Sequence, residues 1–501
     1  MSAESHAAVA REDGRKEWSL SSRRGVAILL LLSLVQFMDI LDASILNIAL
    51  PSIKHDLGFS QQSLQWVVDG YILTYGGFLL LGARMADLLG RRLVLVTGLV
   101  VFAGSSLAGG LAQSSSLLVG ARFAQGLGAA MLSPAALSTL TTTFRSGRER
   151  HTALGVWGAV SGLGGAAGVL FGGLLTEGPG WRWVLFVNVP LSAIAFAGAF
   201  ALLQRDRIRA RLAHFDALGA FLVTGGMLLL VYALVKAPDV GWGATRTIAE
   251  LAGATAILAA FVVNELRVRN PLIPLSILRV RGVAVADATQ LVAAGGFVPM
   301  FFFLTLYMQT VLGYSPIQTG LAYLPLTGGF IISSGIASQL FARIGTKPVI
   351  VAGAVIAAAG LYWLSRIPVD GSYTTDILPG LLVVSLGGGG VFVGVTTAAN
   401  AGVGEDRAGL AAGLLNTGQQ VGTALGLAVL SALATAHTEA LLRGRHTVAQ
   451  AATEGYGRAL LAGGVIVLAG AAVALLAPNT RQTAPVFEEE QAEEPALDLA
   501  A

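Results

Sequence analysis

Long apolar runs recur along the whole chain, and they constrain its fold more than any other feature. Fourteen stretches of about twenty or more mostly apolar residues are separated by short polar segments. About twenty such residues let one helix cross a bilayer, and in lipid only helices or closed barrels satisfy every backbone polar group. We predict an all-α polytopic membrane protein with helices over residues 25–50, 63–83, 93–112, 116–140, 151–175, 182–204, 214–235, 246–266, 284–312, 317–341, 346–366, 376–400, 408–436 and 457–477.

The composition excludes several other classes of protein. Charged residues make up 12% of the chain, against about 25% in a soluble domain. The chain contains no Cys, which removes disulfides, thiol catalysis and cysteine metal sites. Its six His residues have no metal-ligand spacing, and there is no phosphate-binding G-x-x-x-x-G-K-[ST] sequence. We predict no metal, no cofactor, no ATP drive and no enzymatic activity.

The basic residues predict how the helices are oriented. Of the 32 Lys and Arg residues, 23 fall in segments on the side of the N-terminus and 8 in segments on the other side. Because cytoplasmic loops carry the excess of Lys and Arg, we predict that both termini are cytoplasmic. The first 24 residues show no cleaved signal peptide, and the Arg-, Ala- and Gly-rich composition suggests a bacterial plasma membrane. The net charge of +3 reflects this orientation and does not imply a nucleic-acid partner.

Two carboxylates lie inside the first predicted span, in the segment D39-I-L-D-A-S-I-L-N-I-A-L-P51. A charge at that depth costs about 2.5 kcal/mol or more and usually marks an ion or substrate pathway. Asp42 lies about 12 Å below Leu50, and Arg122 about 9 Å below the outer start of its helix, so the two can meet. A carboxylate whose ion pairing and contact with water change with conformation can take up and release a proton. The alternatives are a static pair, or an Arg122 that extends to the surface.

Other intramembrane acids receive weaker assignments. Asp39 precedes Asp42 by three residues and lies on nearly the same helix face, so we interpret it as a second proton or cation site, with a lining contact as the alternative. Asp69, in the outer third of its span, either attracts cationic substrates at the extracellular mouth or is a simple interfacial acid. Asp287 lies near the cytosol and is expected to extend toward the surface.

The chain contains a weak internal repeat. The stretch A83-R-M-A-D-L-L-G-R-R-L-V-L95 is repeated as S338-Q-L-F-A-R-I-G-T-K-P-V-I350, with Gly90 matching Gly345 and Asp87 replaced by Ala342. Repeated halves are typical of secondary transporters. We predict five parts, which are a cytoplasmic tail (1–24), a six-helix bundle (25–204), two inserted helices with basic flanking loops (205–281), a second six-helix bundle (282–477) and an acidic cytoplasmic tail (478–501).

These motifs together resemble the major facilitator superfamily, and within it the fourteen-helix drug:proton antiporter family. The resemblance rests on the loop motif at 83–95 and on further segments in order along the chain, which are L41-D-A-S-I-L-N-I-A-L-P51, W66-V-V-D-G-Y71, R122-F-A-Q-G-L-G128, W181-R-W-V-L-F-V-N-V-P190 and G313-Y-S-P-I-Q-T-G-L320.

The resemblance assigns roles to several residues. Asp42 matches the family's helix-1 carboxylate, whereas Asp39 stands where the family usually has an apolar residue. It implies that Asp87 latches the outward-facing state, with Gly90 allowing the tight turn and Arg91 and Arg92 supplying charge-assisted bonds between the bundles. Membrane orientation alone would also explain the two arginines.

Small residues recur every four positions in the fifth predicted span. Gly164, Gly168 and Gly172, with Gly173 beside them, allow a second helix to approach closely, and packing alone would explain them. The family's antiporter motif has Pro where this chain has Val169, which retains the backbone N–H and removes a kink.

A substrate cavity is predicted from polar and aromatic side chains within the spans. Amides are costly next to lipid and therefore face protein or water. The candidate lining residues are Asp69, Asn47, Gln125, Gln290, Asn416 and Gln420, together with the aromatic residues Trp157, Phe303 and Tyr307.

The resemblance and the buried acids together favour a monomeric exporter of hydrophobic small molecules or antibiotics, cationic ones included. It would exchange them for protons by alternating access, with the bilayer as its surroundings. The alternatives are a dedicated exporter of one metabolite, lipid or amino acid, a non-transporting sensor on the same fold, and a channel.

Overall fold

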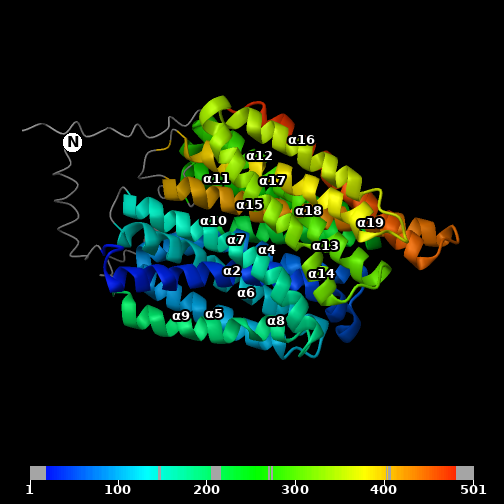
Figure 1. The fold of residues 1–501 in the computed structure, drawn as a ribbon, viewed down its shortest axis with the longest axis horizontal. Helices are drawn as coiled ribbons and strands as arrows, with labels where there is room; N and C mark the ends of the chain where they lie inside the picture. Colours follow the sequence, from blue (N-terminus) through cyan, green and yellow to red (C-terminus); the bar gives the residue numbers. More distant parts are fainter. Residues whose placement is uncertain are drawn as a thin grey trace, which may run out of the picture.

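The computed structural model describes residues 18–144, 148–204, 216–268, 271, 275–401, 403 and 408–480, and within these ranges every regular element is helical, with no strand. The helices run side by side as one elongated bundle (Figure 1). They are α2 (Arg23–Leu57), α3 (Gln61–Leu64), α4 (Trp66–Leu89), α5 (Arg91–Gly110), α6 (Ser115–Thr143), α7 (Arg148–Glu177), α8 (Trp183–Phe186), α9 (Asn188–Leu202), α10 (Ala217–Val240), α11 (Thr245–Arg267), α12 (Arg281–Phe297), α13 (Pro299–Leu306), α14 (Pro316–Ala322), α15 (Leu324–Ile344), α16 (Thr346–Leu364), α17 (Leu378–Asn400), α18 (Ala408–Arg443) and α19 (Val448–Ala474), with short helical turns η2 (Leu275–Arg279), η3 (Tyr307–Val311) and η4 (Tyr373–Ile377).

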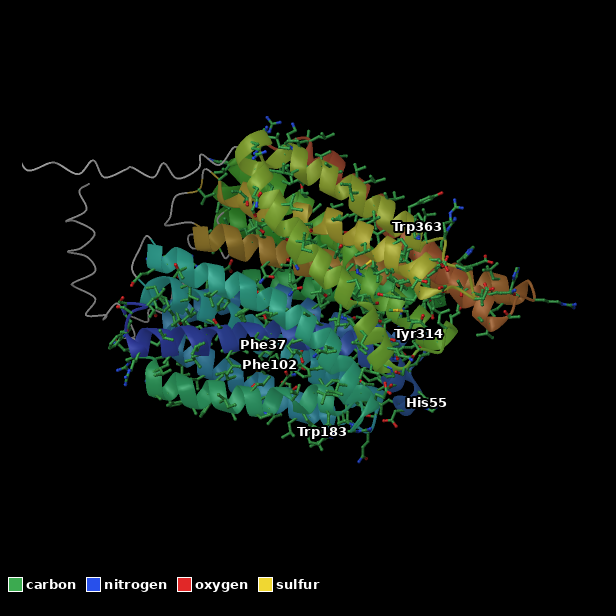
Figure 2. All side chains as sticks on the ribbon, in the orientation of Figure 1. Phe37, His55, Phe102, Trp183, Tyr314 and Trp363 are labelled. Carbon is green, nitrogen blue, oxygen red and sulfur yellow. The ribbon has the colours of Figure 1, made fainter. Side chains whose placement is uncertain are left out.

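The all-α, membrane-spanning architecture is confirmed. Eleven described helical segments are long and apolar enough to cross a membrane. Three further long helices, α4, α6 and α10, fill the remaining predicted spans. Large apolar side chains such as Leu30 (63% exposed) and Phe221 (74%) lie on the outside, as expected for a surface covered by lipid. Figure 2 shows Trp183 and Trp363 on the outside of the bundle, toward the end where His55 lies.

The predicted boundaries differ most at the hairpin between α18 and α19. We predicted a loop over 437–456, whereas α18 continues to Arg443 and α19 begins at Val448. A capping box explains the early start, because the Thr447 side chain accepts from the backbone of Gln450 and the Gln450 side chain accepts from the backbone of Thr447. In Figure 1 this orange hairpin projects beyond the neighbouring helices.

Two sets of helices pack within themselves and touch along a seam. In the first set α2 packs on α7, and both α4 and α5 pack on α6. In the second, α12 packs on α18 and α19, and α15 and α16 pack on α17. Contacts of α4 with α18 and of α7 with α14 join the sets, and α10 packs on α11, α18 and α4. The division into two six-helix bundles with an inserted pair stays a prediction.

Helix α10 is held to α4 by side chains. Thr224 donates a hydrogen bond of 3.2 Å to the carbonyl of Gly77. The ring centroids of Trp66 and Tyr232 lie 6.4 Å apart, with the two ring planes tilted by 41°. One helix of the predicted inserted pair is therefore attached to a helix of the first set.

The C-terminal end of the described chain returns to the start of α16. Asn479 accepts from the backbone N–H of Lys347 at 3.2 Å and donates to the carbonyl of Ile344 at 3.1 Å. Thr480 accepts from the backbone N–H of Thr346 at 3.0 Å. These bonds satisfy N–H groups at a helix N-terminus that have no partner within the helix.

The contact between α12 and α18 depends on glycines. A Cβ atom at Gly426 would lie 2.0 Å from the carbonyl oxygen of Gly295. We expect Gly426→Ala to destabilise the protein by about 1–3 kcal/mol because the helices must separate. Gly413→Ala, on the same helix with nothing within 4 Å of its Cβ position, is the control. Equal melting temperatures of the two purified variants in detergent would contradict this expectation.

Candidate functional site

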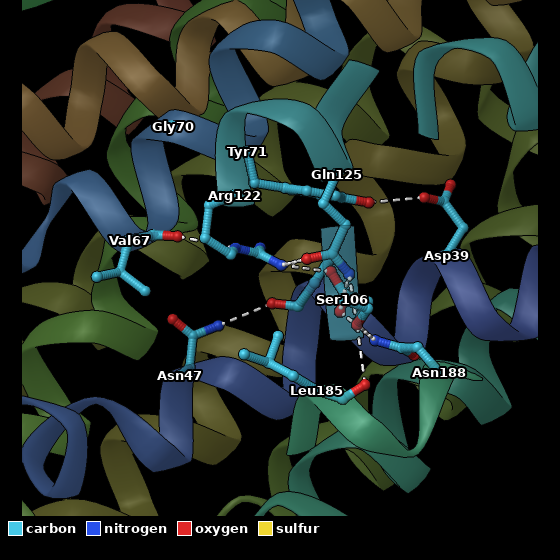
Figure 3. A network of polar contacts seen from close by, with 12 residues as sticks. Asp39, Asn47, Val67, Gly70, Tyr71, Ser106, Arg122, Gln125, Leu185 and Asn188 are labelled. Atoms are coloured by element: carbon cyan, nitrogen blue, oxygen red, sulfur yellow. Dashed lines mark hydrogen bonds and ion pairs between the residues drawn. The ribbon is translucent and has the colours of Figure 1, made fainter. Parts of the chain in front are cut away.

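An ion pair lies at the centre of the first set of helices. Asp42 is midway along α2 and 0% exposed, and Arg122, on α6, is 1% exposed. Arg122 Nη1 donates to Asp42 Oδ2 at 2.8 Å and to Gln125 Oε1 at 2.7 Å. The other carboxylate oxygen, Oδ1, accepts from Gln125 Nε2 at 2.8 Å and from Asn188 Nδ2 at 2.6 Å. Arg122 therefore does not extend to the surface, and both carboxylate oxygens of Asp42 are hydrogen-bonded. Figure 3 shows Arg122, Gln125 and Asn188 in this network.

Further groups hold this pair in place. Ser106, on α5, accepts from Gln125 at 3.2 Å and from Asn188 at 3.0 Å, and donates to the carbonyl of Leu185 at 2.8 Å. Arg122 Nε donates to the carbonyl of Val67 at 3.0 Å, and its guanidinium carbon lies 4.3 Å from the centroid of the Tyr71 ring. A buried charge pair needs such additional partners to offset its desolvation.

Asn188 and Ser106 were absent from the sequence-based predictions. Asn188 is the first residue of α9, directly after the break from α8 at Val187, and this position turns its amide toward Asp42. Its place in the W181–P190 motif could have marked it as a candidate functional residue. Ser106 lies within an apolar span with no distinguishing neighbour, so no sequence signal marked it.

Asp39 occupies a second polar site, one turn along α2 from Asp42. It is 2% exposed. Tyr71 donates to its Oδ1 at 2.8 Å and Tyr75 donates to its Oδ2 at 2.8 Å. The side chain is therefore enclosed by two hydroxyl groups of α4.

Two other acids are buried without a recorded partner. Asp69 is 0% exposed, and neither of its carboxylate oxygens has a hydrogen-bond partner in the described part of the chain. Its carboxylate is enclosed in this conformation, and the role at the extracellular mouth stays a prediction. Both carboxylate oxygens of Asp287 are likewise buried and without a described partner. Its side chain points into the protein, which contradicts the expected extension to the surface.

The aromatic residues predicted to line the cavity lie in different environments. Phe303 and Tyr307 are 1% and 0% exposed, and Phe303 packs between the rings of Phe302 and Tyr456. Apolar packing in the C-terminal core encloses them in this conformation, and their assignment as cavity lining stays a prediction. Trp157, on α7, is partly exposed.

The amide residues also have different environments. Gln290 is buried and donates to Gln419 at 2.9 Å, so it joins α12 to α18. Asn47 donates to the carbonyl of Ala43 in its own helix. Asn416 and Gln420 are partly exposed on α18, and a Cβ at Gly76 of α4 would lie 2.9 Å from Gln420 Cβ. The last two therefore lie at the seam between the two sets of helices.

The predicted gating loop is only partly described. Asp87 lies in α4, but its side chain falls outside the described residues. Gly90 has φ +101° between α4 and α5, a conformation that favours glycine. Arg91 donates to Thr142 at 2.6 Å, and Arg92 donates to the carbonyl of Phe200 at 3.1 Å. These recorded acceptors lie on α6 and α9, and α9 packs on α5 and α2, so both belong with the first set of helices.

The glycines of α7 face two different helices. Cβ atoms at Gly164, Gly168 and Gly172 would lie 3.0 Å or less from backbone atoms of α2. A Cβ at Gly173 would instead lie 2.7 Å from Ile317 Cα of α14. Helix α7 is therefore wedged between α2 and α14, and Gly173 lies at a contact between the two sets.

Two hydrogen bonds join the sets at the same end. Gln309 Nε2 donates to the carbonyl of Ile48 at 2.9 Å, and the backbone N–H of Ile317 donates to Glu177 Oε2 at 3.1 Å. With the close approach at Gly173, they connect α2 and α7 to the segment η3–α14 at the end predicted to be extracellular.

Comparison with known proteins decides the family. Residues 32–427 match the model of the Major Facilitator Superfamily. The chain belongs to this superfamily. Membership confirms the resemblance drawn from the motifs and the prediction of a membrane transporter that is not an enzyme.

Curated members of the superfamily resemble the chain over most of its length. The "Puromycin resistance protein pur8" of Streptomyces alboniger is 41% identical over 450 residues, which cover 88% of this chain and 86% of that protein. The "Cephamycin export protein CmcT" of Amycolatopsis lactamdurans is 42% identical over 80% of this chain and 83% of that protein. The "Multidrug resistance protein Stp" of Mycobacterium tuberculosis is 34% identical over 81% of this chain and 75% of that protein.

Solved structures share the superfamily fold at low sequence identity. The POT family transporter PepTSo aligns with a TM-score of 0.65 at 15% identity, over 92% of this chain and 99% of that one. An inward-facing, unoccupied bacterial homologue of the human lysosomal transporter Spinster aligns with a TM-score of 0.64 at 17% identity, over 91% of this chain and 97% of that one. At this identity the likeness concerns the fold.

Proposed function

We propose that this superfamily member exports hydrophobic small molecules, antibiotics among them, in exchange for protons. The observation that carries the proposal is the Asp42–Arg122 pair, which is fully buried and joined by Gln125 and Asn188. A carboxylate in such a site gains or loses its proton when a conformational change alters its partners or its contact with water. The printed names of the relatives, which refer to antibiotic resistance and export, support the same substrate class.

We also propose that transport proceeds by alternating access. We propose two six-helix bundles, with both termini cytoplasmic, that rock about a central cavity. The contacts at Gly173, Glu177 and Gln309 would close the extracellular side in this conformation and would separate when the protein opens outward. One proton crossing a 100 mV potential supplies about 2.3 kcal/mol, enough for a gradient of a few tens-fold in a neutral substrate.

The test uses proteoliposomes with puromycin and ethidium as probes and an imposed pH gradient. We expect movement of the probe against its gradient, coupled to proton flux and abolished by a protonophore. Flux that continues after the gradient is dissipated would indicate a channel, and no flux of any compound in a wider panel would indicate a sensor. Transport of a single compound from the panel would indicate a dedicated exporter.

The gating loop gives a further prediction. We propose that Asp87 stabilises one conformation at the cytoplasmic rim, near the N-terminus of a helix, where an anion is favoured. We expect Asp87→Asn to slow transport several-fold with substrate affinity unchanged, measured as initial rates over a range of substrate concentrations. A large loss of affinity with normal turnover would mean that Asp87 is not a gate.

A further inference from the structure

The site around Asp39 has a composition unlike that of the Asp42 site. Its recorded side-chain partners in the described chain are the hydroxyls of Tyr71 and Tyr75, and no ion pair of Asp39 is recorded there. The titratable and charged groups around it are Asp42 on its own helix, the two tyrosines on α4 and, beyond the Tyr71 ring, Arg122 on α6. A buried carboxylate without a cation is costly when ionised, so binding a proton is a realistic state of this group.

Tyr71 links the two acidic sites. Its hydroxyl donates to Asp39, while the face of its ring contacts the Arg122 guanidinium that binds Asp42. In Figure 3 the Tyr71 hydroxyl points toward Asp39, and Arg122 lies on the other side, toward the network around Ser106. Movement of either acid therefore acts on the surroundings of the other.

Tyr75 links Asp39 to the opposite set of helices. Its hydroxyl donates to Asp39 Oδ2 at 2.8 Å. The side chains of Ser133 on α6 and Asn416 on α18 lie near the same hydroxyl. Helices α4 and α18 approach closely one residue further on, at Gly76 and Gln420. The Tyr75 hydroxyl thus lies in the seam that must change when the two sets of helices move.

We propose that Asp39 is a second proton-binding site and that Tyr75 transmits its protonation state to Asn416 across the seam. The proposal rests on the proposed function and extends it to two titrating carboxyl groups. Asp39 would be a proton-binding residue, and Tyr75 and Asn416 would be positioning residues.

Hydrogen-bond directions give the mechanism. An ionised Asp39 accepts from both tyrosines, and the Tyr75 oxygen can then accept from the Asn416 amide. A proton added to Asp39 makes the carboxyl a donor, so the tyrosine that accepts from it turns its own hydrogen toward another acceptor. For Tyr75 that acceptor is Asn416 or Ser133. The direction of the bond across the seam therefore reports whether Asp39 holds a proton, and no covalent bond other than O–H changes.

Infrared spectroscopy of the purified full chain tests the proposal without a transport substrate. We expect one of the protonated-carboxyl C=O stretching bands of the buried acids to belong to Asp39. Asp39→Asn should remove that band, while Asp56→Asn, at an exposed acid of α2, should leave it in place. An unchanged carboxyl signal in Asp39→Asn would overturn the proposal.

Variants that retain Asp39 test the link and do not depend on the stability of Asp39→Asn. Tyr75→Phe and Asn416→Ala should shift the frequency and titration midpoint of the Asp39 band. Gln420→Ala, one turn further along α18, is the matched control. If Asn416→Ala leaves the Asp39 band unmoved, the link fails. If the Asp39 band behaves as expected but the protein shows no proton-coupled transport in proteoliposomes, the proposed function fails instead.

Discussion

Replacing Asp42 by Asn should reduce proton-driven export to the level of liposomes without protein. The Asn amide cannot bind and release a proton as the Asp carboxylate can, so the transport cycle loses its coupling step. We expect the same result for puromycin and ethidium, because the defect lies in the driving reaction. The measurement is substrate accumulation in proteoliposomes under a fixed pH gradient.

The variant should still fold, although breaking a buried ion pair can cost about 3–5 kcal/mol. Arg122 keeps the Val67 carbonyl, Gln125 Oε1 and the Tyr71 ring as partners. A monodisperse protein in detergent and retained substrate binding would confirm this. Asp56→Asn, at the exposed partner of Arg182 on the same helix, should export normally. Full proton-driven export by Asp42→Asn would refute the assignment.

Replacing Gly173 by Ala should shift the protein toward its outward-open state and lower export. The added Cβ would lie 2.7 Å from both Ile317 Cα and the carbonyl oxygen of Pro316, and backbone atoms cannot rotate away as a flexible side chain can. Overpacking of this kind costs about 1–3 kcal/mol, which corresponds to about a 5–150-fold change in a conformational equilibrium.

Spin labels can measure this shift directly, since the chain has no native Cys. Cysteines introduced at Leu174 on α7 and Leu321 on α14, both about half exposed, carry the labels. We expect longer label-to-label distances in Gly173→Ala than in the parent, and no change in Gly165→Ala, whose Cβ would meet only Ser44 Oγ at 4.0 Å. Unchanged distances together with normal export would show that this contact does not close the extracellular side.

The helices were largely predictable because lipid imposes a single rule, that backbone bonds close within each span. The pairing of Asp42 with Arg122 was also accessible, since helix rise alone gives the depth of each side chain. The early start of α19 was not recognised because the spans were placed from apolar runs alone, and the segment before residue 457 is more polar than the spans. There the capping box at Thr447 was the better guide.

Side-chain environments were harder to predict. An aromatic residue in an apolar span packs equally well in a core or around a ligand, so the sequence could not separate Phe303 and Tyr307, which are buried, from Trp157, which is partly exposed. The donors to Asp39 had a signal that was not used. Tyr71 and Tyr75 are four residues apart, hence on one face of α4, and a buried hydroxyl requires a partner.

The attachment of α10 to α4 has a mechanical consequence. The bond from Thr224 to the Gly77 carbonyl and the tilted ring contact of Tyr232 with Trp66 fasten this helix to one side of the seam, while it also lies against α18. When the halves tilt, α10 should travel with α4 and slide over α18. It would then shield the contact between α4 and α18 from lipid acyl chains during the tilt. A transporter with twelve spans has no such helix and must exclude lipid there in another way.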